Sequence, residues 1–348
     1  MGKKMHYSPP LDDGNTRKNM TPEFYKIFAE YREIAVRYDE PHKAVWCYFN
    51  PVPRPCFSSA MLRDIRSFQQ NIIDFFHARK SNAGYPIRYV LFCSQIPGIY
   101  NLGGDLALFI KLIKEKNKVQ LLEYAIQCID TVYLNAVSMD LPVTTIALVE
   151  GTALGGGFET ALSSNILIAT EEAEMGLPEI RFNLFPGMGA YSLLARMSGT
   201  RTAEKIIGSG AIYSAGELHD MGIVTHLIGS KNGRKNVERI LRQLSQSGNG
   251  YRAMLQARQR YHPITYQELE DIVRMWVDAA LRLKSKDLRM MDRIVKAQQA
   301  KMQQQEKKFL LRTKQDRRFT SGATTFPLTD NSGNLITADR RKNIDRRS

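Results

Sequence analysis

Short apolar runs alternate with helical patterns from residue 44 to residue 228, and this alternation constrains the fold more than any other feature of the chain. Runs rich in β-forming residues lie at 44–50, 88–94, 143–151 and 165–170. Apolar side chains recur at helical spacing in 61–80, 105–116 and 118–139. Strands that are separated by helices predict an α/β fold with crossover connections, not a β-sandwich or a helical bundle.

The two ends of the chain have a different character from its middle. Residues 1–20 are polar and read as a flexible arm, and Thr21-Pro22 predicts the start of a helix that continues through Tyr38. From 265 to about 318 the pattern is helical throughout. We therefore expect four segments, namely an arm at 1–20, a core at 21–260, a helical region at 261–318 and a flexible basic tail at 319–348.

Composition narrows the classes of protein that this chain can belong to. With 43% hydrophobic and 24% charged residues among 348, a packed globular fold is expected. No apolar stretch is long enough for a membrane span, and the N-terminus lacks the apolar part of a signal peptide, which favours a cytoplasmic location. The four cysteines show neither a C-x-x-C pair nor zinc spacing, so we expect reduced thiols and no metal site.

The net charge is +14, and the distribution of the basic residues along the chain affects which partners it suggests. Residues 301–348 hold 12 Lys/Arg and five Asp/Glu, so half of the excess lies in the last 48 residues. Such an excess suggests an acidic partner. A solvated face is the more ordinary interpretation, and a nucleic-acid partner is not favoured.

Two glycine-rich turns, IYNLGGDL (99–106) and VEGTALGGGFE (149–159), each follow an apolar strand. Glycines that lead into a helix leave backbone N–H groups free and let a ligand oxygen approach them closely. Neither turn matches a phosphate loop or a dinucleotide fingerprint, since Phe158, Glu159 and Thr160 stand where a third glycine is needed. One amide from each turn could instead stabilise a single oxyanion.

Two glutamates accompany these turns in apolar surroundings. Glu159 lies three residues after Gly156, in the first turn of a short helix, and Glu179 follows in GLPEIRF. Burial beside Leu177, Ile180 and Phe182 would raise the pKa of Glu179 and let it donate a proton. The alternatives are a helix N-terminal charge for Glu159 and an exposed loop acid for Glu179.

The segment from 147 to 199 resembles the central signature of the crotonase superfamily, the enoyl-CoA hydratase/isomerase group. Its motifs are Gly-Gly-Gly-Phe-Glu after a strand, then G-L-P-E, then P-G-x-G. The segment SQIPGIYNLGGDL (94–106), together with GGGFETALS and LFPGMGAYS, is similar to the diffusible signal factor synthases of that superfamily. The superfamily resemblance covers roughly residues 85–230, and the synthase-like pattern extends over most of the chain.

This resemblance implies a spiral of β-β-α units in two roughly perpendicular sheets, with C-terminal helices that build a homotrimer. It implies oxyanion-hole amides at Leu102 or Gly103 and at Gly156, and catalytic acids at Glu159 and Glu179, with the acid and base roles open. No cofactor is implied. The implied substrate is a 3-hydroxyacyl chain on acyl carrier protein, which is dehydrated to the cis-2-enoyl form and then released by thioester hydrolysis.

An acyl chain needs an apolar slot, and each candidate for its wall could equally be ordinary core. These candidates are Leu154, Phe158, Leu184, Phe185, Met188 and Trp276. A mildly basic surface would attract the acidic carrier protein, and the basic tail could contact a regulatory protein. Two alternatives remain, namely an ordinary enoyl-CoA hydratase or isomerase acting on CoA esters, and a crotonase-fold protein that binds RNA or protein without catalysis.

Overall fold

The structure is a computed structural model that describes residues 21–51, 53–78, 86–231, 233–315, 328–329 and 335–336. The body of the chain, up to residue 305, forms one compact unit, and residues 306–348 form a second. Within the second unit, β11 (Leu328–Thr329) and β12 (Leu335–Ile336) pair antiparallel. The expected arm at 1–20 lies outside the described residues, as does most of the expected tail.

A six-stranded sheet forms the centre of the body, in the order β1-β2-β3-β5-β7-β10. Strands β1 and β2 pair antiparallel, and the other neighbours pair parallel. The strands are β1 (Ile34–Asp39), β2 (Ala44–Phe49), β3 (Tyr89–Ser94), β5 (Thr144–Val149), β7 (Ile166–Thr170) and β10 (His226–Ile228).

A second sheet has four strands in the order β4-β6-β8-β9, of which only β9 runs antiparallel to its neighbour. They are β4 (Gly98–Asn101), β6 (Gly151–Leu154), β8 (Glu174–Gly176) and β9 (Ile212–Ser214). The chain alternates between the sheets, because β3, β5 and β7 of the first are followed directly by β4, β6 and β8 of the second. The expected α/β fold with β-β-α units is therefore confirmed.

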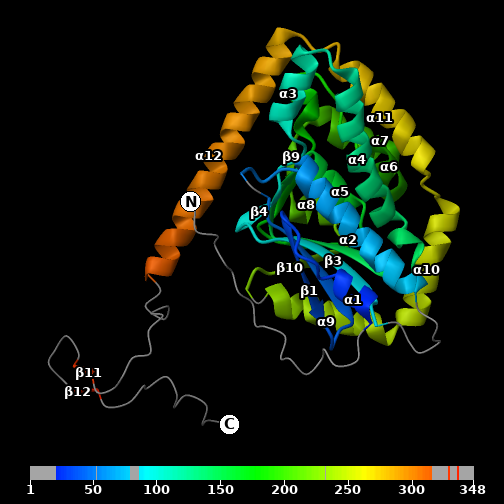
Figure 1. Cartoon of the computed structure of the whole chain (residues 1–348), viewed down its shortest axis with the longest axis vertical. Helices are drawn as coiled ribbons and strands as arrows, with labels where there is room; N and C mark the ends of the chain where they lie inside the picture. Colours follow the sequence, from blue (N-terminus) through cyan, green and yellow to red (C-terminus); the bar gives the residue numbers. More distant parts are fainter. Residues whose placement is uncertain are drawn as a thin grey trace. The chain divides into compact units, whose positions relative to one another are not determined.

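Helices cover both faces of the six-stranded sheet (Figure 1). Along β3, Tyr89 and Leu91 pack against α9 (Gly233–Gln246), while Val90 and Phe92 join the larger core beneath α2 (Ser59–His77) and α4 (Lys118–Ala136). Apolar residues on both faces are what a buried parallel sheet requires. The helices of these layers are α2 (Ser59–His77), α3 (Leu106–Lys114), α4 (Lys118–Ala136), α5 (Gly156–Leu162), α6 (Ala190–Ser198), α7 (Thr200–Ser209), α8 (Ala215–Asp220) and α9 (Gly233–Gln246).

The C-terminal part of the body is helical, as expected. It consists of α10 (Gly248–Tyr261), α11 (Tyr266–Ala280) and the start of α12 (Ser285–Gln315). Helix α11 packs along α4, with Leu269, Val273 and Trp276 buried on one face. Two 3-10 helices, η2 (Ser138–Asp140) and η3 (Pro178–Phe182), complete the body.

The prediction of one helix from residue 21 to Tyr38 is wrong in its second half. Helix α1 (Pro22–Lys26) begins as expected after Thr21, with proline in its first turn, but it has only five residues. Residues 34–39 are instead strand β1, which pairs with β2. Pairing with an adjacent strand overrides the local helical pattern here, because a sheet edge next to β2 can form backbone hydrogen bonds that the pattern of one segment does not reveal.

Other expectations about single residues are confirmed. Cys47, Cys56, Cys93 and Cys128 are buried free thiols. His219 lies in the last turn of α8, where its ring nitrogen Nδ1 is hydrogen-bonded to the Val224 carbonyl. No helix among the described residues has the length and hydropathy that a membrane span needs.

Candidate active site

Three neighbouring parallel strands end at the same edge of the four-stranded sheet, and each leads into a part of the site. Strand β4 leads into the first glycine turn, and β6 leads into the second turn and α5. Strand β8 leads into η3, which carries Glu179. Because the carboxyl ends of parallel strands meet at one edge, residues separated by some 75 positions in sequence come together here.

The first glycine turn is held by hydrogen bonds that occupy both amides suggested by the sequence. The Leu102 N–H donates to the Pro55 carbonyl at 2.7 Å. The Gly103 N–H donates to Oδ1 of the buried Asn101 at 2.8 Å. Gly103 has φ +99°, and a Cβ on it would lie 2.9 Å from the Leu154 carbonyl oxygen, so this position requires glycine.

The next amide along the turn, that of Gly104, has no such acceptor. Within the part of the chain that the structure describes, the N–H groups of Gly104 and Gly156 donate no hydrogen bond. Gly156 is the first residue of α5, where an N–H has no partner within the helix. A Cβ built on Gly156 would lie 3.4 Å from Gly104 N. Two free amides, one from each turn, are therefore neighbours, and the sequence analysis missed Gly104.

Glu159 is fully buried in the first turn of α5 and accepts hydrogen bonds from the chain that follows η3. Its Oε1 accepts from Met188 N–H at 2.7 Å and from Ala190 N–H at 3.0 Å. Burial raises the pKa of this carboxyl, and the two amide bonds partly oppose that rise because they favour the charged form.

Glu179 lies in η3 with its carboxyl group against Gly155. Its Oε2 is buried without a hydrogen-bond partner. Burial raises the pKa of Glu179, and the nearby charge of Glu159 raises it further. Leu177 and Phe182 are buried beside it as expected, whereas Ile180 is 43% exposed and does not shield it.

The two glutamates therefore differ in which form their surroundings favour. Glu159 keeps two donors that stabilise a carboxylate, while Glu179 has a partnerless buried oxygen and a like charge nearby. A proton shared by the pair belongs on Glu179. The site thus holds two carboxyl groups with raised pKa values beside two free amides, a combination suited to proton transfer next to a carbonyl.

Apolar side chains cover the free amides. A Cβ on Gly104 would meet the Phe109 ring and the Met188 methyl group, and one on Gly156 would lie 3.1 Å from Met188 Sδ. The rings of Phe109 and Trp276 pack edge to face with centroids 5.0 Å apart. The structure thus brings Met188 and Trp276 to the site and adds Phe109, which the sequence analysis missed because an apolar residue of α3 looks like ordinary core.

The other candidates for an acyl slot stay a prediction, and they differ in burial. Phe158 is fully buried in α5, Leu184 is 4% exposed, and Phe185 and Leu154 are half-buried. Leu184 follows η3 and donates its N–H to the Glu179 carbonyl at 3.1 Å. Phe158 and Leu184 are part of the main hydrophobic core, and Phe185 packs against that core.

A family model for enoyl-CoA hydratase/isomerase matches residues 85–275, which is more than half of the chain. The chain belongs to the enoyl-CoA hydratase/isomerase family. The matched region contains both glycine turns, Glu159 and Glu179. It ends before α12.

Known hydratases are similar to this family member, in sequence over part of their length and in structure over most of it. The mitochondrial methylglutaconyl-CoA hydratase of Mus musculus is 34% identical over 144 residues, which is 41% of this chain and 43% of that enzyme. The match therefore spans less than half of the mouse enzyme. The enoyl-CoA hydratase structure of Bacillus anthracis has a TM-score of 0.57 at 22% identity, covering 73% of this chain and 93% of that one. The structure of Pseudomonas aeruginosa DspI has a TM-score of 0.56 at 22% identity, covering 67% and 83%.

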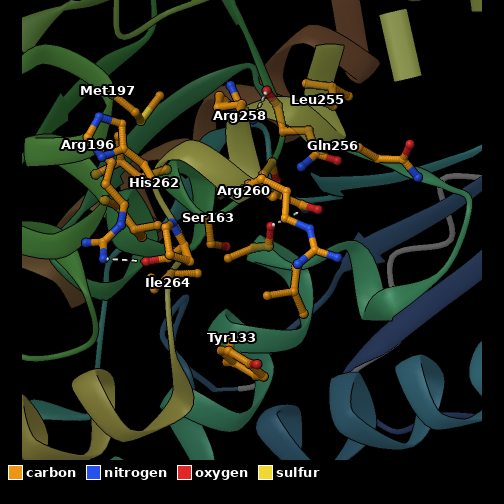
Figure 2. A pocket seen from close by; sticks show the side chains of 18 of the residues that line it. Tyr133, Ser163, Arg196, Met197, Leu255, Gln256, Arg258, Arg260, His262 and Ile264 are labelled. Carbon is orange, nitrogen blue, oxygen red and sulfur yellow. Dashed lines mark hydrogen bonds between the residues drawn. The ribbon is translucent and has the colours of Figure 1, made fainter. Parts of the chain in front are cut away.

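A large open cavity of about 1190 Å³ lies away from the glutamates of this family member. Figure 2 shows Arg196, Arg258, Arg260 and His262 around it. Ser163, at the C-terminal end of α5, also lines it, whereas Gly156 and Glu159 are at the other end of that helix. The cavity is thus distinct from the site of the two glutamates. Among the described residues, no cluster of His, Cys, Asp and Glu side chains could hold a metal ion.

Proposed function

We propose that this protein is a 3-hydroxyacyl thioester dehydratase of the diffusible signal factor synthase type. The observation that carries the proposal is the pairing of a buried base, Glu159, and a buried acid, Glu179, with the free amides of Gly104 and Gly156. In this proposal Gly104 takes the place that we expected for Leu102 or Gly103, because those two amides already have acceptors.

The proposed dehydration begins with the thioester carbonyl oxygen between the two free amides. The Glu159 carboxylate removes the C2 proton, and the amides stabilise the negative charge that develops on the carbonyl oxygen. The bond between C3 and its hydroxyl then breaks, and Glu179 gives that oxygen its proton so that water leaves. The product is the 2-enoyl thioester, with Glu159 protonated and Glu179 ionised.

Release of the free acid would need a second step at the same site. Water attacks the thioester carbon, with an ionised glutamate as the base that takes its proton. The same amides stabilise the tetrahedral oxyanion, and the carrier thiol leaves after it is protonated. The similarity of 94–106, 155–163 and 184–192 to the synthases supports acyl carrier protein as carrier and hydrolysis as the last step.

Mass spectrometry of the products tests the proposal. A medium-chain 3-hydroxyacyl group is offered on acyl carrier protein and, separately, on CoA to the wild-type protein and to Glu159→Gln and Glu179→Gln. We expect a free 2-enoic acid from the carrier-protein substrate and at least about 100-fold slower turnover in either variant. Glu123→Gln, at an exposed position of α4, is the matched control and should behave like the wild type.

The second candidate is a hydratase acting on CoA esters, which the similarity to methylglutaconyl-CoA hydratase favours. Reversible hydration confined to the CoA ester, without free acid, would replace the synthase proposal by this one. Absence of turnover with both carriers would reject both enzymes and leave the crotonase-fold binding protein.

We propose that the C-terminal helices assemble the protein into a homotrimer. Met254 in α10 is 55% exposed, Tyr261 is 79% exposed, and Met275 in α11 is 62% exposed. Large apolar side chains that are this exposed on the C-terminal helices suggest a contact surface. Light scattering on the purified protein should give three times the monomer mass, and a monomeric mass would reject this part of the proposal.

A further inference from the structure

The C-terminal helix α12 reaches the first glycine turn through one side chain, that of Gln298. Its Nε2 donates a hydrogen bond of 2.9 Å to the Leu102 carbonyl. The body of the chain extends to residue 305, so this contact lies within one compact unit. Gln298 is outside the residues that the family model matches.

With this contact, both polar groups of a single peptide unit are hydrogen-bonded. The Leu102 carbonyl and the Gly103 N–H belong to the same planar peptide unit and point in opposite directions. Gln298 holds the carbonyl, and the Asn101 side chain holds the N–H. The plane of this unit is therefore fixed from both ends.

This Leu102–Gly103 peptide unit directly precedes the Gly103–Gly104 unit, which carries the free amide. The following unit joins the Gly103 carbonyl to the Gly104 N–H, and its carbonyl accepts the Phe57 N–H at 2.8 Å. Gly103 connects the two units at φ +99°, where glycine has much conformational freedom. Anchors on both sides of Gly103 thus determine the direction in which the Gly104 N–H points.

Helix α12 is held in place by buried apolar side chains, so it can fix the position of Gln298. Leu288, Met291 and Val295 are buried at helical spacing, and Gln298 continues the same stripe. Near the start of the helix, Asp287 Oδ2 accepts the Lys284 N–H at 2.9 Å and lies 3.5 Å from Nδ2 of Asn183, which caps η3.

The two polar contacts lie on one face of α12. Asp287 and Gln298 are 11 residues apart, which is about three turns and about 16 Å along the axis. One end of this span touches the element that carries Glu179, and the other touches the first glycine turn. The helix therefore bridges both halves of the site.

We propose that Gln298 is a positioning residue, through which α12 sets the direction of the Gly104 N–H and so the strength of the oxyanion hole. This inference rests on the proposed function, because it assumes that a thioester oxygen binds at Gly104 and Gly156. Gln298 itself need not touch the substrate.

The test compares Gln298→Leu, which removes the donor at similar volume, with Gln298→Lys, which restores an N–H donor on a long side chain. Gln299→Leu is the matched control, since Gln299 is the adjacent, exposed glutamine of the same helix. Loss of a whole oxyanion donor costs about 100- to 1000-fold in kcat, so misdirecting one should cost about 10-fold. We expect that loss in kcat for Gln298→Leu, with KM within about twofold, partial recovery in Gln298→Lys and no change in Gln299→Leu.

A spectroscopic readout separates positioning from mere stability. Octanoyl-CoA with carbon-13 at its carbonyl lacks a 3-hydroxyl and cannot be dehydrated. Its carbonyl stretch, recorded by rapid mixing before the thioester is hydrolysed, reports the hydrogen bonds in the hole. We expect a shift to lower frequency in the wild type and a smaller shift in Gln298→Leu. A wild-type kcat and carbonyl band in Gln298→Leu, with only a lower melting temperature, would overturn the inference and leave the proposed function intact. No shift in the wild type would overturn the proposed oxyanion hole, and the inference with it.

Discussion

At the scale of single residues, the site contains two glutamates whose hydrogen-bonding surroundings differ. Glu159 is fully buried, Glu179 is half-buried with its Oε2 out of contact with solvent, and burial raises the pKa of both carboxyl groups. Two backbone amides favour the carboxylate form of Glu159, whereas nothing among the described residues bonds Oε2 of Glu179. Unequal surroundings for two acids are how an enzyme assigns acid and base roles at neutral pH.

The pH dependence of turnover follows from this difference. The proposed dehydration needs Glu159 ionised, so activity should fall as the pH drops through its raised pKa. It also needs Glu179 protonated, so activity should fall as the pH rises through its raised pKa. A profile of kcat/KM against pH should be bell-shaped, with both limbs above the ordinary glutamate range. An acidic limb at the usual glutamate pKa would contradict the burial of Glu159.

Adjacent glycines of the second turn should respond differently to alanine. In Gly156→Ala the added methyl meets Met188 Sδ and lies 3.4 Å from Gly104 N, so it enters the space between the two free amides. We expect a folded protein whose turnover falls at least about 100-fold, as when an oxyanion donor is lost.

Gly157→Ala serves as the comparison for that experiment. Its methyl would collide with the Asn101 backbone carbonyl, which cannot swing aside. We therefore expect a lower melting temperature or poor folding, measured by circular dichroism. Equal loss of stability in both variants would argue that Gly156 is structural and has no role in an oxyanion hole.

At the scale of elements, α11 is the part of the C-terminal region that packs most directly on the site. Trp276 is 5% exposed and contacts both Phe109 and Gly187. Replacing a buried tryptophan by alanine leaves a cavity and usually costs about 3–5 kcal/mol. Trp276→Ala should lower the free energy of unfolding by that amount in urea titrations.

Two further variants show whether that loss is specific. Trp276→Phe keeps an aromatic ring against Phe109 and should lose less stability than Trp276→Ala. Val119→Ala, at a position of α4 that is 67% exposed, should change the free energy of unfolding by less than about 0.5 kcal/mol. A small loss in Trp276→Ala would mean that α11 is not a firm part of the site.

At the scale of the whole molecule, the reactivity of the buried thiols shows whether the body of the chain opens to solvent as one unit. Cys47, Cys56, Cys93 and Cys128 are each at most 4% exposed, and burial raises the pKa of every one of these thiols. A thiol must ionise to react, so an aromatic disulfide reagent at pH 8 should modify none of them in the native protein. All four should react in guanidinium chloride.

Cys56 is the informative member of this group. It lies in the segment whose neighbours Pro55 and Phe57 anchor the first glycine turn. Faster native labelling of Cys56 than of the other three would show that this segment opens locally, and the turn would then be less rigid than the structure indicates.

The sequence predicted much of the fold because strands and helices leave periodic patterns. The apolar runs at 44–50, 88–94 and 165–170 became β2, β3 and β7, and both glutamates and Gly156 were identified from motifs. The prediction failed at 34–39, where pairing with β2 replaced a helix, and at Ile180, whose exposure depends on which face of η3 meets the core.

What the sequence determined by itself is the set of chemical groups, which is two acids, two glycine turns and an α/β chain able to bury them. Only the tertiary structure decided that the Leu102 amide is not free, because its acceptor, the Pro55 carbonyl, comes from a distant segment, whereas the Gly103 amide is bonded locally by Asn101. It also brought Phe109 and Gln298 to the site from α3 and α12. Hydrogen bonds and contacts between distant segments depend on the three-dimensional path of the chain, and no local pattern records them.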